Sequence, residues 1–132
     1  MSRENVEVVR RSLDAYSRRD IKTLREIIDP DLELDWSASL GELAGVHRGI
    51  DAVLRFYTEW YAMFEMTVIE PDRFLEIDDS VIVPNVARLR GREEIEVSAR
   101  SAFVFTMRNR RITHIRLYQE TSEALKAVGL EG

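Results

Sequence analysis

The segment that decides the fold is residues 50–68, IDAVLRFYTEWYAMFEMTV. Its apolar residues first recur at helical spacing, from Ile50 through Tyr57 to Phe64, which predicts an amphipathic helix. After Phe64 the spacing changes to two, with Met66 and Val68, which predicts a strand. This change of period separates a mainly helical first half of the chain from a second half made of strands.

Two helices and one short strand are predicted before this segment. The helices cover residues 4–18 and 21–28, and Asp20 is placed as the N-cap of the second one. Alternating apolar and acidic residues over 32–36 predict a half-buried strand. Residues 37–49 show no clear period, and we expect a loop there.

Four strands and a closing helix are predicted after it. The strands cover residues 66–77 with a break near Pro71, then 81–90, 96–107 and 112–120, and the helix covers 122–128. Helices followed by a long run of strands predict an α+β architecture, with three helices on the concave face of a curved, mostly antiparallel sheet. Such a cone encloses a pocket.

Composition narrows the class of protein. The 132 residues are 45% apolar and 33% charged, which predicts a single globular domain over 1–132. No apolar run reaches 18 residues and no apolar signal core opens the chain, so we expect no membrane partner and a cytoplasmic location. The net charge of −5 argues against a nucleic-acid partner. Without cysteine, and with two separated histidines, we expect no metal site and no cofactor.

Four stretches of the chain match a pattern that spans most of its length: Glu4-Asn5-Val6, Asp29-Pro30-Asp31-Leu32-Glu33, His47-Arg48-Gly49 and Ile112-Thr113-His114-Ile115-Arg116-Leu117-Tyr118. In these stretches the chain resembles the SnoaL-like, polyketide cyclase-type family of the nuclear transport factor 2-like superfamily. The resemblance implies the cone-shaped, cystatin-like α+β fold. It implies no single activity, because this superfamily includes cyclases, isomerases, epoxide hydrolases, dehydratases and non-catalytic binders.

Two known mechanisms of the superfamily are not matched. The resemblance to ketosteroid isomerases places Trp36 where their carboxylate base stands, and Ser12 and Ser101 where their two oxyanion donors stand. Limonene epoxide hydrolases use an Asp-Arg-Asp arrangement, and here Arg100 is followed two residues later by Ala102.

We expect a mostly apolar pocket between the third helix and the inner strand faces. The residues predicted for its wall are Trp36, Tyr57, Trp60, Asn85, Ser101, Phe103 and Tyr118. Asn85 and Ser101 are polar residues on apolar strand faces, so either they orient a ligand or they pair with each other or with backbone.

For proton transfer, His47 is the first candidate because histidine is the side chain suited to acid–base work near neutral pH, and Glu120 is the second. Asp35 is a weaker candidate, since strand alternation directs it away from Trp36. Two hypotheses follow: a cyclase- or hydrolase-type enzyme acting on a small, polycyclic molecule, or a non-catalytic binder of such a ligand.

A homodimer is expected through the outer face of the sheet, where Val86, Ala102 and Val104 interrupt an otherwise polar surface. The charged residues on that face are Arg88, Arg90, Glu96 and Arg100, which predict cross-strand charge pairs.

Δ5-3-Ketosteroids should not be isomerised at an enzymatic rate. Trp36, Ser12 and Ser101 replace the base and both oxyanion donors, and loss of one such donor alone costs on the order of 100 to 1,000-fold in rate. A direct absorbance assay of the conjugated product tests this. Turnover well above the buffer rate would show that the three positions are wrongly aligned.

Overall fold

The computed structural model describes residues 2–39, 43–91, 93 and 95–129, and its elements follow the predicted order. The helices are α1 (Ser2–Arg18), α2 (Ile21–Ile27), α3 (Ile50–Met63) and α4 (Thr121–Ala127). The strands are β1 (Ile28–Asp35), β2 (Val46–Arg48), β3 (Phe64–Pro71), β4 (Leu75–Ile77), β5 (Ser80–Gly91), β6 (Glu96–Arg108) and β7 (Arg111–Tyr118). None of the helices within these residues is long and apolar enough to cross a membrane.

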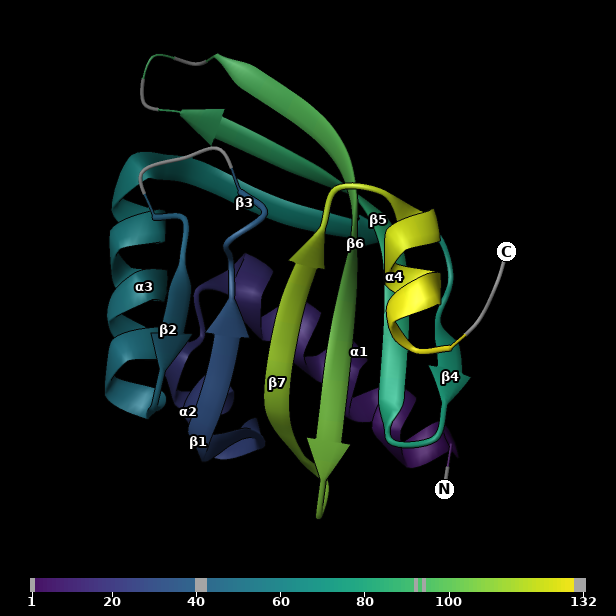
Figure 1. The fold of residues 1–132 in the computed structure, drawn as a ribbon. Coiled ribbons are helices and arrows are strands. Elements are labelled where there is room, and N and C mark those ends of the chain that lie inside the picture. Colours follow the sequence, from purple (N-terminus) through teal and green to yellow (C-terminus); the bar gives the residue numbers. More distant parts are fainter. Residues whose placement is uncertain (1, 40–42, 92, 94, 130–132) are drawn as a thin grey trace.

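Within the described residues, seven strands form one curved sheet in the order β2-β1-β7-β6-β5-β3, with β4 paired to β5. The strands pair antiparallel except β1 and β7, which run parallel. Figure 1 shows α1 crossing behind the strands while α4 lies in front of them. The predicted α+β cone, with three helices on the concave face, is confirmed.

The region from the second helix to the third differs from the prediction in two places. Helix α2 ends at Ile27, and Ile28 already pairs with Ile112 as the first residue of β1. Within the expected loop, β2 pairs antiparallel with β1, and Arg48 donates to Glu33 at 2.9 Å. A strand of three residues is too short to show an alternating pattern, so sequence periodicity could not detect it.

Helix α4 covers the part of the outer sheet face that motivated the dimer. Ala102 and Val104 are buried there together with Ile82 and Ala124 of α4. Two of the three apolar residues predicted to interrupt the polar outer face, Ala102 and Val104, are therefore already covered within the chain. The third, Val86, remains partly exposed.

The arginines of the outer face pair with a different element from the one expected. Arg88 lies 2.9 Å from Glu70 of β3 and Arg100 lies 3.5 Å from Asp72, while side chains of both pairs stay largely exposed. The acidic partners thus come from β3 and the turn after it rather than from β6. Such exposed pairs contribute little to stability.

The ends of α1 and α3 are connected by a group of hydrogen bonds that we call the α1–α3 tie, formed by Tyr16, Arg19, Trp60 and Tyr61. The Tyr61 hydroxyl donates to the Tyr16 carbonyl oxygen at 2.6 Å, and Trp60 Nε1–H donates to the Tyr16 hydroxyl at 2.7 Å. The Arg19 guanidinium donates to the carbonyl oxygens of Tyr61, at 3.0 Å, and Phe64. Because Arg19 binds carbonyls at the end of α3, it satisfies groups that a helix end leaves unpaired.

Tyr61→Phe should lower the free energy of unfolding by about 1 kcal/mol, since it removes one partly buried hydrogen bond and keeps the ring. Urea denaturation measures the effect. Tyr118→Phe is the matched control, because no hydrogen bond of its hydroxyl is found among the described residues, and it should change stability by less than about 0.5 kcal/mol. Equal stability of the two variants would mean that the tie is not formed in solution.

Candidate functional site

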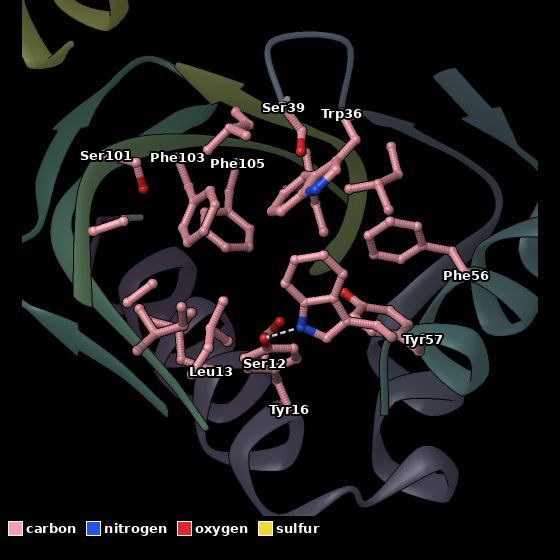
Figure 2. A pocket seen from close by; sticks show the side chains of 18 of the residues that line it. Ser12, Leu13, Tyr16, Trp36, Ser39, Phe56, Tyr57, Ser101, Phe103 and Phe105 are labelled. Carbon is pink, nitrogen blue, oxygen red and sulfur yellow. Dashed lines mark hydrogen bonds between the residues drawn. The ribbon is translucent and has the colours of Figure 1, made fainter. Parts of the chain in front are cut away.

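A cavity of about 190 Å³ lies between α1, α3 and the concave face of the sheet. Figure 2 shows side chains from these elements pointing into it, with Tyr16 of α1, Phe56 of α3 and Phe103 of β6 on different sides. A cavity of about 150 Å³ holds benzene, so this one has room for a flat ring system of one to two rings.

Aromatic rings form one large part of its wall, and aliphatic side chains such as Leu34 and Leu89 form much of the rest. Trp36 and Phe103 stack with centroids 5.7 Å apart, and Phe56 and Trp60 stack at the same separation. Trp36 also meets Phe56 edge-on at 5.5 Å, which joins the two stacks. Rings in mutual contact hold one another in fixed orientations, so this part of the wall presents flat apolar faces to the cavity.

One part of the wall is polar. It carries the hydroxyl groups of Ser12, Tyr16 and Tyr57. Ser12 lies one turn before Tyr16 on α1, and the rings of Tyr16 and Tyr57 are 6.0 Å apart. Burial raises the pKa of Tyr16 to about 12, although the hydrogen bond from Trp60 offsets part of the effect. Burial also raises the pKa of Tyr57. Both phenols are therefore neutral at physiological pH.

Two buried polar groups lie beside these rings. Trp36 Nε1 forms no hydrogen bond with any described residue, whereas Thr67 Oγ1 lies close enough to the Tyr16 hydroxyl to lower the pKa of Tyr16 as a hydrogen-bond partner. A buried polar group without a partner costs about 1–3 kcal/mol. Such groups are uncommon in folded proteins and gather where ligands or water bind.

Five of the seven residues predicted for the wall do line the cavity: Trp36, Tyr57, Trp60, Ser101 and Phe103. Asn85 does not line it. Its side chain is 1% exposed, donates to the Val83 carbonyl at 2.9 Å and accepts from the Ser101 hydroxyl at 3.3 Å. Of the two alternatives left open for Asn85 and Ser101, the structure shows the pairing with each other and with backbone.

Tyr118 lies on the other side of the sheet. Ile115 and Leu117 face the cavity from β7, so strand alternation directs Tyr118 outward, where the Arg116 guanidinium lies 4.8 Å from its ring centre. It borders a separate polar hollow on that face, with Glu33 and Asp35 among its neighbours.

The candidates for proton transfer lie outside the cavity wall. His47 on β2 packs against Phe56 with ring centres 4.9 Å apart, and its Nε2 lies 2.9 Å from the carbonyl oxygen of Leu43. Glu120 is exposed and occupies the N-cap position of α4. Phe56 thus stands between His47 and the cavity.

Asp35 also faces away from the cavity. Its partial burial would raise its pKa, but hydrogen bonds from Ser37 and the charge of Arg116 hold the pKa below its usual range. The Arg116 guanidinium lies 3.4 Å from the carboxylate. Asp35 is therefore ionised at neutral pH. Its carboxylate lies on the opposite face of the sheet and does not line the cavity.

The three positions aligned with the isomerase machinery do meet at the cavity, since Ser12, Trp36 and Ser101 all line it. Sequence reasoning missed other members of the wall, above all Tyr16 and Phe56. Tyr16 falls on the apolar face of the first helix, at helical spacing from Val9 and Leu13. A buried tyrosine hydroxyl needs a polar partner, and this requirement could have indicated that Tyr16 lies beside a polar group or a pocket.

Among the described residues that line the cavity, none is an aspartate, glutamate or histidine. The charged residue among them is Arg100. Its side chain is 78% exposed and pairs with Asp72 at the rim of the cavity. No group of three or more histidine, aspartate or glutamate side chains within the described part of the chain could hold a metal ion.

Proteins of the same fold carry different descriptions. TerC, crystallised with polyporic acid, superposes with a TM-score of 0.78 at 20% identity, over 95% of this chain and 97% of its own. A candidate polyketide cyclase of Sinorhizobium meliloti gives a TM-score of 0.66 at 25% identity, over 84% of this chain and 93% of its own.

Sequence comparison identifies the family. An uncharacterised protein of Mycobacterium tuberculosis is 32% identical over 114 residues, covering 84% of this chain and 85% of that protein. The family model described as the SnoaL-like domain matches residues 9–115, from the middle of α1 to β7. Because this match covers more than half of the chain, from within α1 to within β7, the chain belongs to the SnoaL-like domain family.

Proposed function

We propose that this protein binds a small, flat, largely apolar molecule inside the cone, and that binding rather than acid–base turnover is its activity. The observation that carries the proposal is the wall of stacked rings around Trp36 and Phe56, interrupted by neutral hydroxyl groups. Ligand pockets have this composition: apolar faces supply contact area, and a few fixed polar groups orient the ligand.

The charges around the cavity support binding over catalysis. A general acid or base must come within hydrogen-bond distance of its substrate with a pKa near the working pH. His47 and Glu120 do not line the cavity, and Asp35 faces the opposite side of the sheet. The buried tyrosines keep their protons, because burial raises their pKa. Non-catalytic binding is thus the hypothesis that the described site favours.

Cyclase-type activity is the second candidate, favoured by the 25% identity to the candidate polyketide cyclase of Sinorhizobium meliloti. In that case the neutral phenols of Tyr16 and Tyr57 would donate hydrogen bonds to a carbonyl oxygen and so stabilise negative charge that develops on it. The base would have to come from the substrate or from water.

For assembly and location we propose a homodimer in the cytoplasm. The outer face of β5, β6 and β7 that α4 leaves uncovered is the surface proposed for pairing, and Val86 lies on it. Its exposed arginine–carboxylate pairs favour a mixed interface over an apolar one.

Ala87→Phe should abolish binding of flat aromatic compounds. Ala87 lines the cavity on β5, and a phenyl group there would occupy the space between the rings. Protein NMR titration with a panel of one- and two-ring compounds, including indane and 1-indanone, measures the change, and at least a tenfold weakening is expected.

Val86→Phe is the matched control, one residue earlier on the same strand and directed to the opposite face. It should bind the panel as the parent does. If no compound binds the parent, or if Ala87→Phe binds as well as Val86→Phe, the proposed site is wrong.

The neutrality of Tyr16 predicts how stability depends on pH. Between pH 10 and 12 the tyrosine of the unfolded chain loses its proton while native Tyr16 keeps it, so the unfolded state binds fewer protons and stability falls as pH rises. The slope reaches at most about 1.4 kcal/mol per pH unit for this group. In urea denaturation from pH 9.5 to 11.5, Tyr16→Phe should show a shallower decline. An identical decline would mean that Tyr16 ionises in the native protein as freely as in the unfolded chain.

A further inference from the structure

The sheet narrows where the cavity meets solvent. Strand β7 pairs with β6 as far as Tyr118, which lies opposite Ala102, and within the described residues the stretch 96–101 of β6 pairs with β5 alone. Figure 1 shows the paired ends of β5 and β6 projecting beyond the end of β7. Ala99 of β6 and Gln119, just after β7, both line the cavity and are exposed. The mouth of the cavity therefore lies at this gap in the sheet.

The inner face of the projecting hairpin continues the apolar wall of the cavity. Residues opposite each other on antiparallel strands point to the same face of a sheet. Leu89 lines the cavity and lies opposite Val97, and Ala87 lines it and lies opposite Ala99. Alternation directs Ile95, two residues before Val97, to the same face. We call Leu89, Ile95, Val97 and Ala99 the hairpin strip.

The outer part of the hairpin strip is uncovered. Thr67 of β3 lies opposite Leu89 and is 2% exposed, whereas Val97, on the other side of Leu89, is 49% exposed and Ile95 is 64% exposed. Ile95 and Val97 are the most exposed of the large hydrophobic side chains in the described part of the chain. An apolar surface that is continuous with a pocket indicates a binding surface, which isolated exposed apolar residues do not.

We infer that the hairpin strip binds a hydrocarbon chain attached to the flat ring that the cavity holds. The inference rests on the proposed ligand-binding function and names the class of ligand: ring compounds that carry an alkyl chain. The cavity of about 190 Å³ has room for the ring, so a chain must leave through the mouth, where the strip begins. From Ala99 to Ile95 the strip extends on the order of 13 Å, the length of an alkyl chain of about ten carbons.

The test compares 4-ethylphenol with 4-octylphenol, which share one ring and differ in chain length. A fully buried methylene tightens binding about fourfold, and one that lies on an open surface about twofold. The parent protein should therefore bind 4-octylphenol on the order of 50-fold more tightly in protein NMR titrations. The methyl signal of Ala87, in the cavity wall, should respond to both phenols, and the methyl signals of Val97 to 4-octylphenol alone.

Val97→Asp places a charge on the hairpin strip and should reduce the difference between the two phenols to less than about fivefold. Its affinity for 4-ethylphenol should change by less than about twofold, because Val97 does not line the cavity. Ser98→Asp is the matched control, since it adds the same charge one residue later, at an exposed position on the opposite face of β6. It should keep the difference of about 50-fold.

Equal affinity of the parent for the two phenols would overturn the role of the hairpin strip while leaving the binding function intact. An equal loss in Val97→Asp and Ser98→Asp would overturn it as well, and so would a 4-octylphenol that fails to bind while other compounds of the aromatic panel bind. If neither phenol and no compound of the panel binds the parent, the proposed function is contradicted and the inference fails with it.

A second copy of the chain is the competing occupant of the hairpin strip. Analytical ultracentrifugation of the ligand-free protein distinguishes the two, because a strip that binds a hydrocarbon chain predicts the same mass for Val97→Asp as for the parent. A lower mass for Val97→Asp would mean that the strip is an interface between copies, and the inference would be overturned.

Discussion

The α1–α3 tie is the constraint on which the site depends. Two successive residues of α3 reach two different groups of Tyr16: Trp60 donates to its side chain and Tyr61 to its main chain. Arg19, just after α1, adds hydrogen bonds to carbonyl oxygens where α3 ends. These contacts set how α3 lies over the concave face, and so set the distance between the aromatic face of α3 and the sheet. They act together with the ring contacts of Trp36 with Phe56 and Phe103, which join α3 to the sheet directly.

The same contacts determine the chemistry of the cavity. Because Trp60 donates to the Tyr16 hydroxyl oxygen, the phenol is held in a fixed orientation at the wall. Burial keeps it neutral, and no carboxylate or imidazole stands among the described wall residues to accept a proton. In the positions aligned with the isomerase base and oxyanion donors, Trp36, Ser12 and Ser101 supply an aromatic face and two hydroxyl groups. The described part of the wall lacks the acid–base pair of those enzymes, and its hydroxyl groups are the polar groups that the proposed binding function requires.

The fold was predictable because its signals are local. The change of period after Phe64 marks the end of α3 and the start of β3, and Asp20 caps α2 as expected, accepting from Thr23 N–H at 3.1 Å. Strand β2 escaped detection because three residues carry no pattern. The position of α4 over Ala102 and Val104 escaped because sequence periodicity shows which face of a strand is apolar but not which element covers it.

The site was predictable only in part, because the sequence does not show which face of a strand turns inward or which distant residues come into contact. Trp36, Trp60 and Phe103 follow from alternation and helical spacing, whereas Tyr118 required knowing which face of β7 turns inward. Asn85 was correctly singled out as a buried polar residue, yet its partners lie two residues away and on the neighbouring strand. The pairing of Tyr16 with Trp60 joins residues 44 positions apart, and no periodicity reports a contact of that range.

The α1–α3 tie can be observed directly through its indole proton. The chain contains two tryptophans, Trp36 and Trp60, so two indole N–H signals are expected in a proton–nitrogen NMR spectrum. The Trp60 signal should lie downfield, exchange slowly with water and move strongly in Tyr16→Phe, because its hydrogen bond to Tyr16 is lost. The Trp36 signal, without a hydrogen-bond partner among the described residues, should stay nearly unchanged in that variant. Two indole protons that exchange alike and ignore Tyr16→Phe would contradict the tie, and with it the fixed cavity that it supports.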